Sequence, residues 1–369
     1  MILIASDAFK GTIGSLEVAQ SLRGPCEEAG FPVTVLPLAD GGEGTVDALV
    51  TCGYEAHQVE VTGPLGQPAT ARWASLNATA GGTAGGTAVI EMAQASGLHL
   101  VDPSPQTAWD AHTYGTGELI VHAIENGCSR IVVGVGGSAT SDGGRGALRA
   151  VKESGVDTSG VAFTVACDVD NPLTGPRGAA EVFGPQKGAD PATVARLEER
   201  LARWADQLDP TGRVRDMPGA GAAGGLGFAL MAGLGADRVS GAEFVLSAVG
   251  FDEQVARARV VVTGEGQFDE QTLGGKGPGT VIARAGAAGV PVIVVCGQAK
   301  LRAGDVGAGL AGRAGFAGAE VVEVAEVFAL TDFAPVQQCI AEPGRVLKEV
   351  GYALATTVRD RGFCDGTSQ

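Results

Sequence analysis

The chain of 369 residues is longer than one hydrophobic core usually supports, so we expect two domains. Its formal net charge of −16 argues against nucleic acid or an anionic membrane as a partner, because both bind clustered lysine and arginine. We see no basic leader, no apolar run long enough for a membrane span and no CxxC pair among seven scattered cysteines, so we expect a cytoplasmic protein with reduced thiols.

The N-terminal stretch repeats a unit of strand, polar loop and helix. We expect strands at residues 2–5 and 33–38, each followed by a helix, the first with Ser15 as its N-cap. Two successive units of this kind predict a parallel sheet with right-handed crossovers.

Charged side chains occupy the loops after both of these strands. Asp7 and Lys10 follow the first strand, and Asp40 and Glu43 follow the second. Loops at the carboxyl ends of neighbouring parallel strands lie side by side, so we expect these four residues to share one rim of the sheet.

From about residue 61 the pattern loosens, and we place the start of a second domain here. Residues 88–98 are typical of a short helix and residues 113–126 of a longer one. The clearest helix signals begin at Asp190, an N-cap that is followed by Pro191 and by apolar residues at spacings of three and four.

A short apolar strand at residues 131–133 breaks into a loop of glycines, hydroxyls and one carboxylate, a composition typical of phosphate binding. Glycine lets backbone N–H groups turn toward an anion, and hydroxyl groups add donors. Asp142 would repel a bare phosphate, so we infer a metal ion between them. The alternative is a glycine-rich surface turn that binds nothing. The predicted phosphate-binding residues are Gly136, Gly137, Ser138, Thr140 and Gly143.

The predicted strand at residues 163–167 ends in two acidic residues. Period-two alternation puts Asp168 and Asp170 on the same side, where two carboxylates can hold Mg²⁺. An Asx-type turn before Pro172 explains the same residues without a metal, and the local sequence does not distinguish the two readings.

Residues 219–224, GAGAAG, match the spacing of the dinucleotide fingerprint, which would favour an oxidoreductase. That fingerprint directly follows a strand, and residues 213–218 do not resemble one. We therefore interpret these glycines as a site of close helix packing.

The last third of the chain returns to the pattern of the first. A strand at residues 260–263 runs into a loop that carries Glu265, Asp269 and Lys276. The elements expected after it are a helix through Val281 and Ile282, strands at residues 291–296 and 320–324, and a terminal helix opened by Pro343. We therefore predict a discontinuous α/β domain from residues 1–60 and 259–369, with residues 61–258 inserted as a mixed α/β domain.

Taken in order, the loops resemble those of the bacterial glycerate kinase family, which phosphorylates D-glycerate with ATP. The resemblance implies a flavodoxin-like domain with a parallel sheet from the two chain ends, an inserted α/β domain and an active site between them. Departures from the family pattern are Ser6, Ala8, Ser141 and Gln267, the last in place of a common arginine. The matching blocks are DAFKG (7–11), ADGGEGT (39–45), TYGTGELI (113–120), GGSATSDGG (136–144), ACDVDNPLTG (166–175), FGPQKGA (183–189), GAGAAGGLG (219–227), TGEGQFDEQT (263–272) and GGKGP (274–278).

Phosphoryl transfer asks the protein mainly for positioning and charge neutralisation, with ATP as co-substrate and Mg²⁺ as the metal. The sequence does not fix which carboxylate binds metal and which acts as a base. We assign Lys10, Asp7 and Asp269 as catalytic, Asp40, Glu43, Lys187 and Lys276 as substrate-binding, and Asp142, Asp168, Asp170 and Glu265 as metal ligands.

The related bacterial enzymes favour 2-phosphoglycerate as the product. Transfer to the 3-hydroxyl of glycerate, or to another small hydroxy acid, is the alternative. A non-catalytic sugar-acid binding module is a further reading, although it would not need so many carboxylates. Small molecules are the expected partners; a homodimer is compatible with the sequence, which leaves the oligomeric state open.

Overall fold

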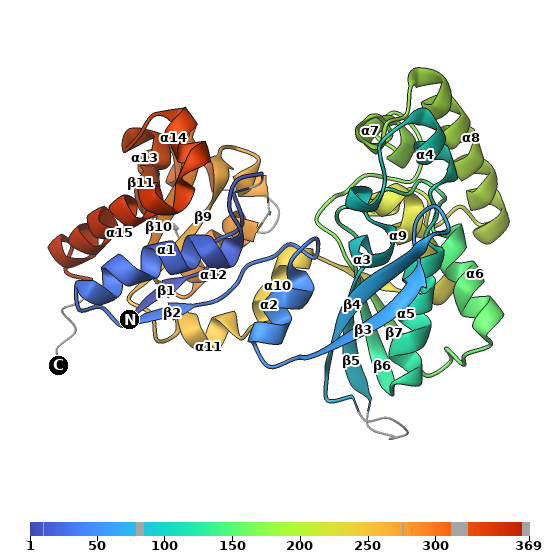
Figure 1. Ribbon diagram of the computed structural model, residues 1–369, viewed down its shortest axis with the longest axis horizontal. Coiled ribbons are helices and arrows are strands. Elements are labelled where there is room, and N and C mark those ends of the chain that lie inside the picture. Colours follow the sequence, from blue (N-terminus) through green and yellow to red (C-terminus); the bar gives the residue numbers. More distant parts are fainter. Residues whose placement is uncertain (10, 79–84, 275–276, 311–323, 364–369) are drawn as a thin grey trace. The chain divides into compact units, whose positions relative to one another are not determined.

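The computed structural model describes residues 1–9, 11–78, 85–274, 277–310 and 324–363. Lys10, Lys276 and most of the strand expected at residues 320–324 lie outside these ranges. Contacts divide the chain into two compact units, unit 1 from Met1–Ala39 and Val245–Gln369 and unit 2 from Asp40–Phe244 (Figure 1). Within the described ranges, we find no helix with the length and apolar character needed to cross a bilayer.

Unit 1 is built on a five-stranded sheet in the order β2-β1-β9-β10-β11, with every neighbouring pair parallel. Numbered along unit 1, this order is 2-1-3-4-5, which is that of flavodoxin-like folds, so the predicted fold class of this part is confirmed. The strands are β1 (Ile2–Ile4), β2 (Val33–Val35), β9 (Val260–Phe268), β10 (Val292–Ala299) and β11 (Val324–Ala329).

Helices cover both faces of this sheet. Alternate strand residues such as Ile4 and Val262 belong to a core shared with α1 (Ser15–Glu28) and α15 (Pro343–Asp360), which lie side by side (Figure 1). On the other face α12 (Gly277–Ala287) packs against β9 and β10. The remaining helices of unit 1 are α11 (Phe251–Val255), α13 (Ala303–Leu310) and α14 (Val336–Ala341), with short 3₁₀ turns at Thr272–Gly274 and Leu330–Asp332.

The first helix begins differently from the prediction. Ser15 is the first helical residue, and the N-cap is Gly14, in an extended conformation. The Glu17 carboxylate accepts a hydrogen bond from the Gly14 N–H (3.2 Å), so a side chain within the first turn satisfies the cap in place of a serine hydroxyl.

Unit 2 contains a six-stranded mixed sheet in the order β3-β4-β5-β6-β7-β8. β4 pairs antiparallel with both β3 and β5, and β5 to β8 run parallel. The prediction of a second, mixed α/β region is therefore confirmed. The strands are β3 (Glu55–Thr62), β4 (Pro68–Leu76), β5 (Gly86–Glu91), β6 (Cys128–Gly134), β7 (Ala162–Ala166) and β8 (Asp237–Val239).

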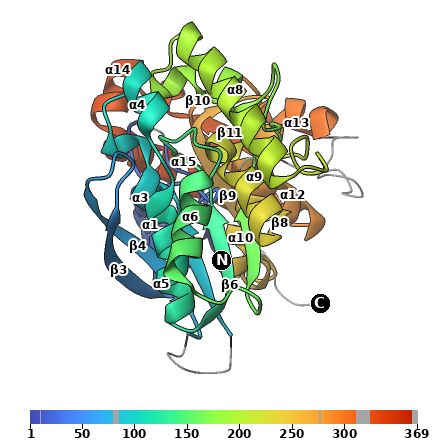
Figure 2. The same cartoon turned by 90° about the vertical axis from the view of Figure 1, so that its right-hand side faces the viewer.

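The helices of unit 2 lie on both faces of this sheet. Ile90 and Val133 face the core that includes α5 (Tyr114–Glu125), while α2 (Thr45–Thr51) packs against β3, β4 and β5 from the opposite face (Figure 1). α5 and α6 (Arg145–Ser154) pack against each other in front of the sheet (Figure 2). The others are α3 (Ala93–Ser96), α4 (Pro105–Asp110), α7 (Ala179–Phe183), α8 (Pro191–Leu208) and α9 (Ala222–Leu234), with 3₁₀ turns at Leu98–Leu100 and Pro185–Lys187. α10 (Gly241–Ala248) begins in unit 2 and continues past the boundary at residues 244–245.

Two local expectations in unit 2 have different outcomes. The helix expected at residues 88–98 forms only as α3 (Ala93–Ser96), and its first part is wrong, because Ala88 to Glu91 form the end of β5, a strand buried between β4 and β6. A continuous apolar run of this length fits a buried strand as well as a helix. The helix signals at Asp190 are confirmed, since its carboxylate accepts the Thr193 N–H (2.7 Å) and Pro191 opens α8.

The contact boundaries differ from those proposed from sequence. We expected residues 1–60 to belong to the terminal domain, whereas residues 40–60 group with unit 2 because α2 and β3 pack on the mixed sheet. Residues 245–258 group with unit 1. The chain therefore passes between the units at residues 39–40 and 244–245.

Candidate active site

Three backbone segments of unit 2 meet without intervening side chains. A Cβ atom on Gly134 would lie 1.9 Å from the Gly41 carbonyl oxygen, and one on Gly241 would lie 2.0 Å from the Asp40 carbonyl oxygen. The loop that carries Asp40 and Glu43 therefore lies directly on the end of β6 and on the first residue of α10. We call residues 40–44, 134–138 and 240–242 the loop cluster.

Packing in the loop cluster predicts that Gly134→Ala lowers the free energy of unfolding of unit 2 by at least about 2 kcal/mol, because backbone atoms must move to admit the methyl group. Gly160→Ala is the matched control, since a Cβ there meets nothing within 4 Å. Urea unfolding followed by tryptophan fluorescence measures the change, because all three tryptophans lie in unit 2. Equal stability of the two variants would contradict the close contact.

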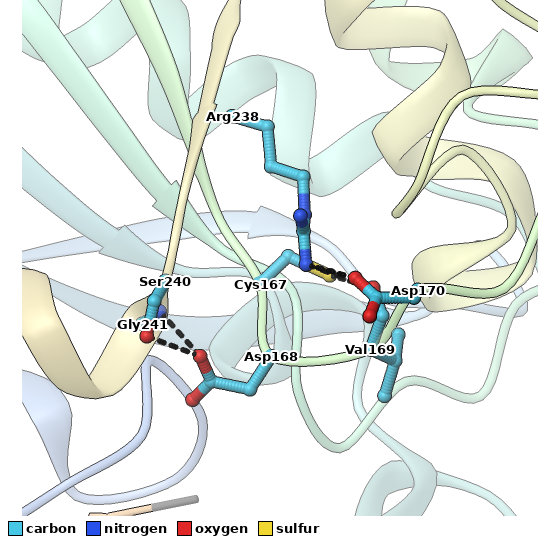
Figure 3. A network of polar contacts seen from close by, with 7 residues as sticks. All are labelled: Cys167, Asp168, Val169, Asp170, Arg238, Ser240 and Gly241. Carbon is cyan, nitrogen blue, oxygen red and sulfur yellow. Dashed lines mark hydrogen bonds and ion pairs between the residues drawn. The ribbon is translucent and has the colours of Figure 1, made fainter. Parts of the chain in front are cut away.

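Asp168 lies just beyond β7 and is directed at the start of α10 (Figure 3). Its Oδ1 accepts hydrogen bonds from the Ser240 hydroxyl (2.7 Å) and the Gly241 N–H (2.8 Å), and its Oδ2 accepts one from the Ala242 N–H (3.1 Å). Burial raises the pKa of Asp168, although these hydrogen bonds oppose the shift. This carboxylate therefore fixes the loop after β7 to the N-terminus of α10.

Asp170 points away from Asp168 (Figure 3). It forms an ion pair with Arg238 (2.6 Å), and the same guanidinium donates to the Val169 carbonyl (3.3 Å). The expectation that strand alternation places Asp168 and Asp170 on one side is wrong, because β7 ends at Ala166 and the period-two geometry ends with it. The two carboxylates have separate partners.

The predicted phosphate loop divides into an outer and an inner part. Gly137 is exposed, Gly136 half-buried, and Ser138 retains 8% exposure. Thr140 is fully buried, and Gly143 donates its N–H to the Gly224 carbonyl (3.0 Å) and accepts from the Trp204 indole (2.9 Å). The structure therefore uses Thr140 and Gly143 for internal packing, and leaves Gly136 and Gly137 toward the surface.

The glycines of residues 219–224 do serve close packing. Gly224 has a left-handed conformation (φ +65°), and a Cβ on it would lie 2.0 Å from the Thr140 carbonyl oxygen. Residues 213–218, which the structure describes, contain no strand. The resemblance of these glycines to a dinucleotide fingerprint thus reflects the approach of α9 to the phosphate loop.

Lys187 is a buried support of the same loop. Its side chain is 2% exposed, and its Nζ donates to the Thr140 carbonyl oxygen (2.5 Å). Burial lowers the pKa of Lys187 to about 7, although the charge of Asp142 opposes the shift. A lysine enclosed in this way holds the loop from inside.

Asp142 anchors the inner part of the loop to two helices. Its Oδ2 accepts from the N–H and the hydroxyl of Thr113 (3.0 and 2.9 Å) and from the Gly146 N–H (2.9 Å), and its Oδ1 accepts from the Gly144 N–H (3.1 Å). Thr113 precedes α5, and Gly144 precedes α6. Four donors occupy the two oxygens that we had assigned to a metal ion.

In unit 1 the predicted acidic residues gather at the carboxyl ends of β1 and β9, which are neighbours in the sheet. The Asp7 N–H donates to the Gly264 carbonyl (2.9 Å), and the Asp7 carboxylate accepts the Ala8 N–H (2.7 Å). Glu265 accepts a hydrogen bond from the Thr272 hydroxyl, which in turn accepts the Asp269 N–H (3.1 Å). In flavodoxin-like sheets the β1/β3 switch point, here β1/β9, is where ligands bind.

Asp269 lies at the end of β9 with donors around it. Burial raises the pKa of Asp269, but hydrogen bonds from Gln267 (2.7 Å) and from the Gln271 N–H (2.9 Å), with the nearby Lys300 ammonium (3.5 Å), lower it overall. The carboxylate is therefore ionised at neutral pH and available to a cation.

Sequence reasoning missed two polar residues beside these loops. Glu91 is 1% exposed at the end of β5 and accepts hydrogen bonds from the Val46 N–H (2.5 Å) and the Gln94 amide (3.3 Å). Burial raises the pKa of Glu91. An acidic residue that ends an apolar run, AVIE, was the available signal for Glu91, whereas nothing in the local sequence marks Ser240 as a partner of Asp168.

Comparison with known proteins adds an independent finding. The model of the glycerate kinase family matches residues 2–161 and 152–356. A glycerate kinase of Bacillus subtilis (strain 168) is 43% identical over 330 residues, and a glycerate 2-kinase of Escherichia coli (strain K12) is 41% identical over 331. Each alignment covers 80% of this chain and 85% of the relative. The crystal structure of a Salmonella typhimurium LT2 protein with the provisional name glycerate kinase 2 superposes with a TM-score of 0.74 at 35% identity, covering 98% of both chains.

Proposed function

Since this chain belongs to the glycerate kinase family and is a phosphotransferase with an alcohol group as acceptor, we propose that it phosphorylates D-glycerate with ATP and forms 2-phosphoglycerate. The observation that carries this proposal is the match to relatives of that name across both units. The E. coli relative, named glycerate 2-kinase, supports transfer to the 2-hydroxyl. In this reaction the glycerate oxygen bonds to the γ-phosphorus, and the bond to the bridging oxygen of ADP breaks.

The outer loop of unit 2 supplies donors for the phosphates of ATP. Gly136 and Gly137 carry no side chain that would cover their N–H groups, and Ser138 adds a hydroxyl. Lys187 and Asp142 hold this loop in shape from within. We accordingly assign phosphate contact to residues 136–138 and support to the residues behind them.

The carboxylates of unit 1 fit a magnesium ion. Mg²⁺ takes hard oxygen ligands and usually binds one or two carboxylates together with substrate phosphates. Glu265 and Asp269 are two carboxylates at the end of β9. The Thr272 hydroxyl donates to the Glu265 carboxylate and accepts from the Asp269 N–H, and the Asp269 carboxylate accepts from Gln267 and the Gln271 N–H. When bound, the ion neutralises charge on the transferred phosphoryl group.

The remaining residues act on glycerate and on the proton it loses. Asp7, fixed to β9 through Gly264, orients the attacking hydroxyl and accepts its proton. Asp40 and Glu43 accept hydrogen bonds from glycerate hydroxyls. Lys10 and Lys276, which the family motifs supply, neutralise phosphate and carboxylate charge.

An assay of ADP release with D-glycerate, ATP and Mg²⁺, followed by phosphorus NMR of the product, tests this proposal. We expect ADP and 2-phosphoglycerate in equal amounts. A 3-phosphoglycerate signal would overturn the regiochemistry, and turnover only with another hydroxy acid would overturn the substrate. Glycerate binding without ADP release would favour the non-catalytic reading.

Lys10→Ala is expected to reduce kcat/KM by at least about 30-fold, which corresponds to about 2 kcal/mol of transition-state stabilisation. The reason is the loss of a positive charge from the transferred phosphoryl group. Lys348→Ala is the control, because this lysine is exposed on α15. Steady-state kinetics measure both variants, and near-normal turnover of Lys10→Ala would remove this lysine from the mechanism.

A further inference from the structure

A second feature of unit 2 is a cavity of about 680 Å³ on the side of the sheet that carries α5 and α6. Residues from the end of α4, from α5, α6 and α8 line it, and these elements are seen in Figure 2. None of the residues to which we assign ATP or glycerate lines it. Its size lies within the range of small-molecule sites. The lining residues used below are Trp109, Tyr114, Arg145, Arg149 and Arg200.

Arg200 brings a half-buried positive charge to this cavity, and no carboxylate forms an ion pair with it in the described part of the chain. Its Nη1 and Nη2 donate to the carbonyl oxygens of Trp109 (2.7 Å) and Ser141 (2.8 Å), which are neutral acceptors. Its Nε is buried and, within the described part of the chain, has no hydrogen-bond partner. Burial lowers the pKa of Arg200, although the charges of Asp142 and Asp110 oppose the shift, and the guanidinium stacks on the Trp109 ring (4.2 Å to the centroid). An anion would improve its surroundings.

Arg145 adds a second positive charge from the first turn of α6. Its guanidinium lies over the Trp204 ring, 5.4 Å from the ring centroid. Across the residues that the structure describes, no hydrogen bond or ion pair holds it. A third arginine, Arg149, is paired with Glu153 (2.8 Å) and lies over the Tyr114 ring.

The two carboxylates of the lining favour the charged form of Arg200 by their charge, but both accept their hydrogen bonds from other groups. Asp142 already accepts four hydrogen bonds from Thr113, Gly144 and Gly146. Asp110 is exposed and accepts a hydrogen bond from Gln106 (2.5 Å). In a chain with a net charge of −16, this cavity therefore gathers three arginines, two of which contact no carboxylate.

We propose that this cavity binds a small organic phosphate, with the phosphate between Arg145 and Arg200 and the organic part beside Tyr114. The Trp109 ring is already stacked against Arg196 and Arg200 (4.1 and 4.2 Å to the ring centroid). Arginine presents paired N–H donors that match phosphate oxygens. The two negative charges of a phosphate dianion balance the two guanidinium groups. The Tyr114 ring suits a planar or apolar organic group. The cavity is too large for inorganic phosphate alone.

The site is connected to the proposed phosphate loop. Arg200 holds the Ser141 carbonyl, and Lys187 holds the carbonyl of the preceding residue, Thr140. A ligand that binds Arg200 therefore contacts the residue that holds the inner part of the phosphate loop. We assign the outer part of the same loop to ATP.

Isothermal titration calorimetry with phenyl phosphate tests the proposal in the absence of ATP and glycerate. This probe has a dianionic phosphate and a planar body, and it is neither substrate nor product of the proposed reaction. We expect one molecule to bind per chain, Arg145→Met to raise the Kd at least tenfold, and benzoate to bind more weakly. Arg203→Met is the matched control, because Arg203 lies on α8 outside the cavity and pairs with Glu199.

Three results would overturn the proposal. The first is that phenyl phosphate at 10 mM gives no heat of binding. The second is that Arg145→Met leaves the Kd of the probe unchanged. The third is that ATP displaces the probe and that Arg145→Met does not alter the affinity for ATP. The Arg145 side chain has no hydrogen bond within the described residues, so we expect Arg145→Met to fold. A melting curve of the variant checks this. The measurement needs no turnover and is therefore independent of the proposed function.

Discussion

Asp142→Ala is expected to lower the free energy of unfolding of unit 2 by roughly 3–5 kcal/mol, the largest effect of any single change considered. The carboxylate accepts four hydrogen bonds and ties the phosphate loop to the starts of α5 and α6. Removing it leaves the Thr113 and Gly146 N–H groups without acceptors in a partly buried site. Asp142→Asn should cost less than Asp142→Ala, because one oxygen can still accept.

Denaturant unfolding followed by tryptophan fluorescence measures this loss. Asp47→Ala is the control in the same unit, since its exposed carboxylate forms a surface ion pair with Arg72, and a change below about 1 kcal/mol is expected there. If Asp142→Ala kept the stability of the wild type and lost activity alone, a metal or substrate role would replace the structural one that the contacts indicate.

Raising the pH from 7 to 9 is expected to stabilise the wild type by about 2 kcal/mol relative to Lys187→Met. The pKa of Lys187 is lowered to about 7 in the folded chain from 10.5, so between these values the unfolded chain binds more protons. Stability then rises with pH by up to about 1.4 kcal/mol per unit. Below pH 7 Lys187 is protonated in both the folded and the unfolded chain. The difference in free energy of unfolding between the wild type and Lys187→Met then stops changing with pH.

The comparison isolates Lys187 because other titrating groups are common to both proteins. Lys152→Met provides the control, since Lys152 is exposed on α6 of the same unit, and its stability difference from the wild type should not vary with pH. If the difference in free energy of unfolding between the wild type and Lys187→Met also did not change with pH, Asp142 would be keeping the buried ammonium charged over the whole range.

Elements with local signals were predictable from the sequence. The N-cap at Asp190 and the apolar spacing of α8 are encoded within a few residues, and the repeated strand and helix units at both chain ends imply the parallel sheet of unit 1. β3 was not predicted, because its residues EAHQVEVT are largely polar and lie at the edge of the mixed sheet. The end of β5 was mistaken for the start of a helix. A strand that is buried on both faces is a continuous apolar run, without the alternation of apolar and polar residues that marks other strands.

The candidate site was predictable as a set of loops but not in its internal arrangement. The motifs located Gly136, Asp142, Asp168 and Lys187, whereas their partners come from distant parts of the chain. Lys187 meets the Thr140 carbonyl, and Asp168 meets the start of α10 more than seventy residues later. No local pattern distinguishes a lysine that reaches a ligand from one that is enclosed. In the structure, the 3₁₀ turn at Pro185–Lys187 packs against α4 and α7, and Lys187 is buried there.

The contact between Gly241 and the Asp40 carbonyl has a consequence for how such a chain can be rearranged. Asp40 opens the continuous segment that forms unit 2, and Gly241 lies near its end, so the two ends of this segment are neighbours. A segment with neighbouring ends can be inserted in a host chain in the way that a closed loop is. The entropic cost of bringing its ends together is small. We therefore expect that its ends can be joined through a short linker in a circular permutation that leaves the sheet order unchanged.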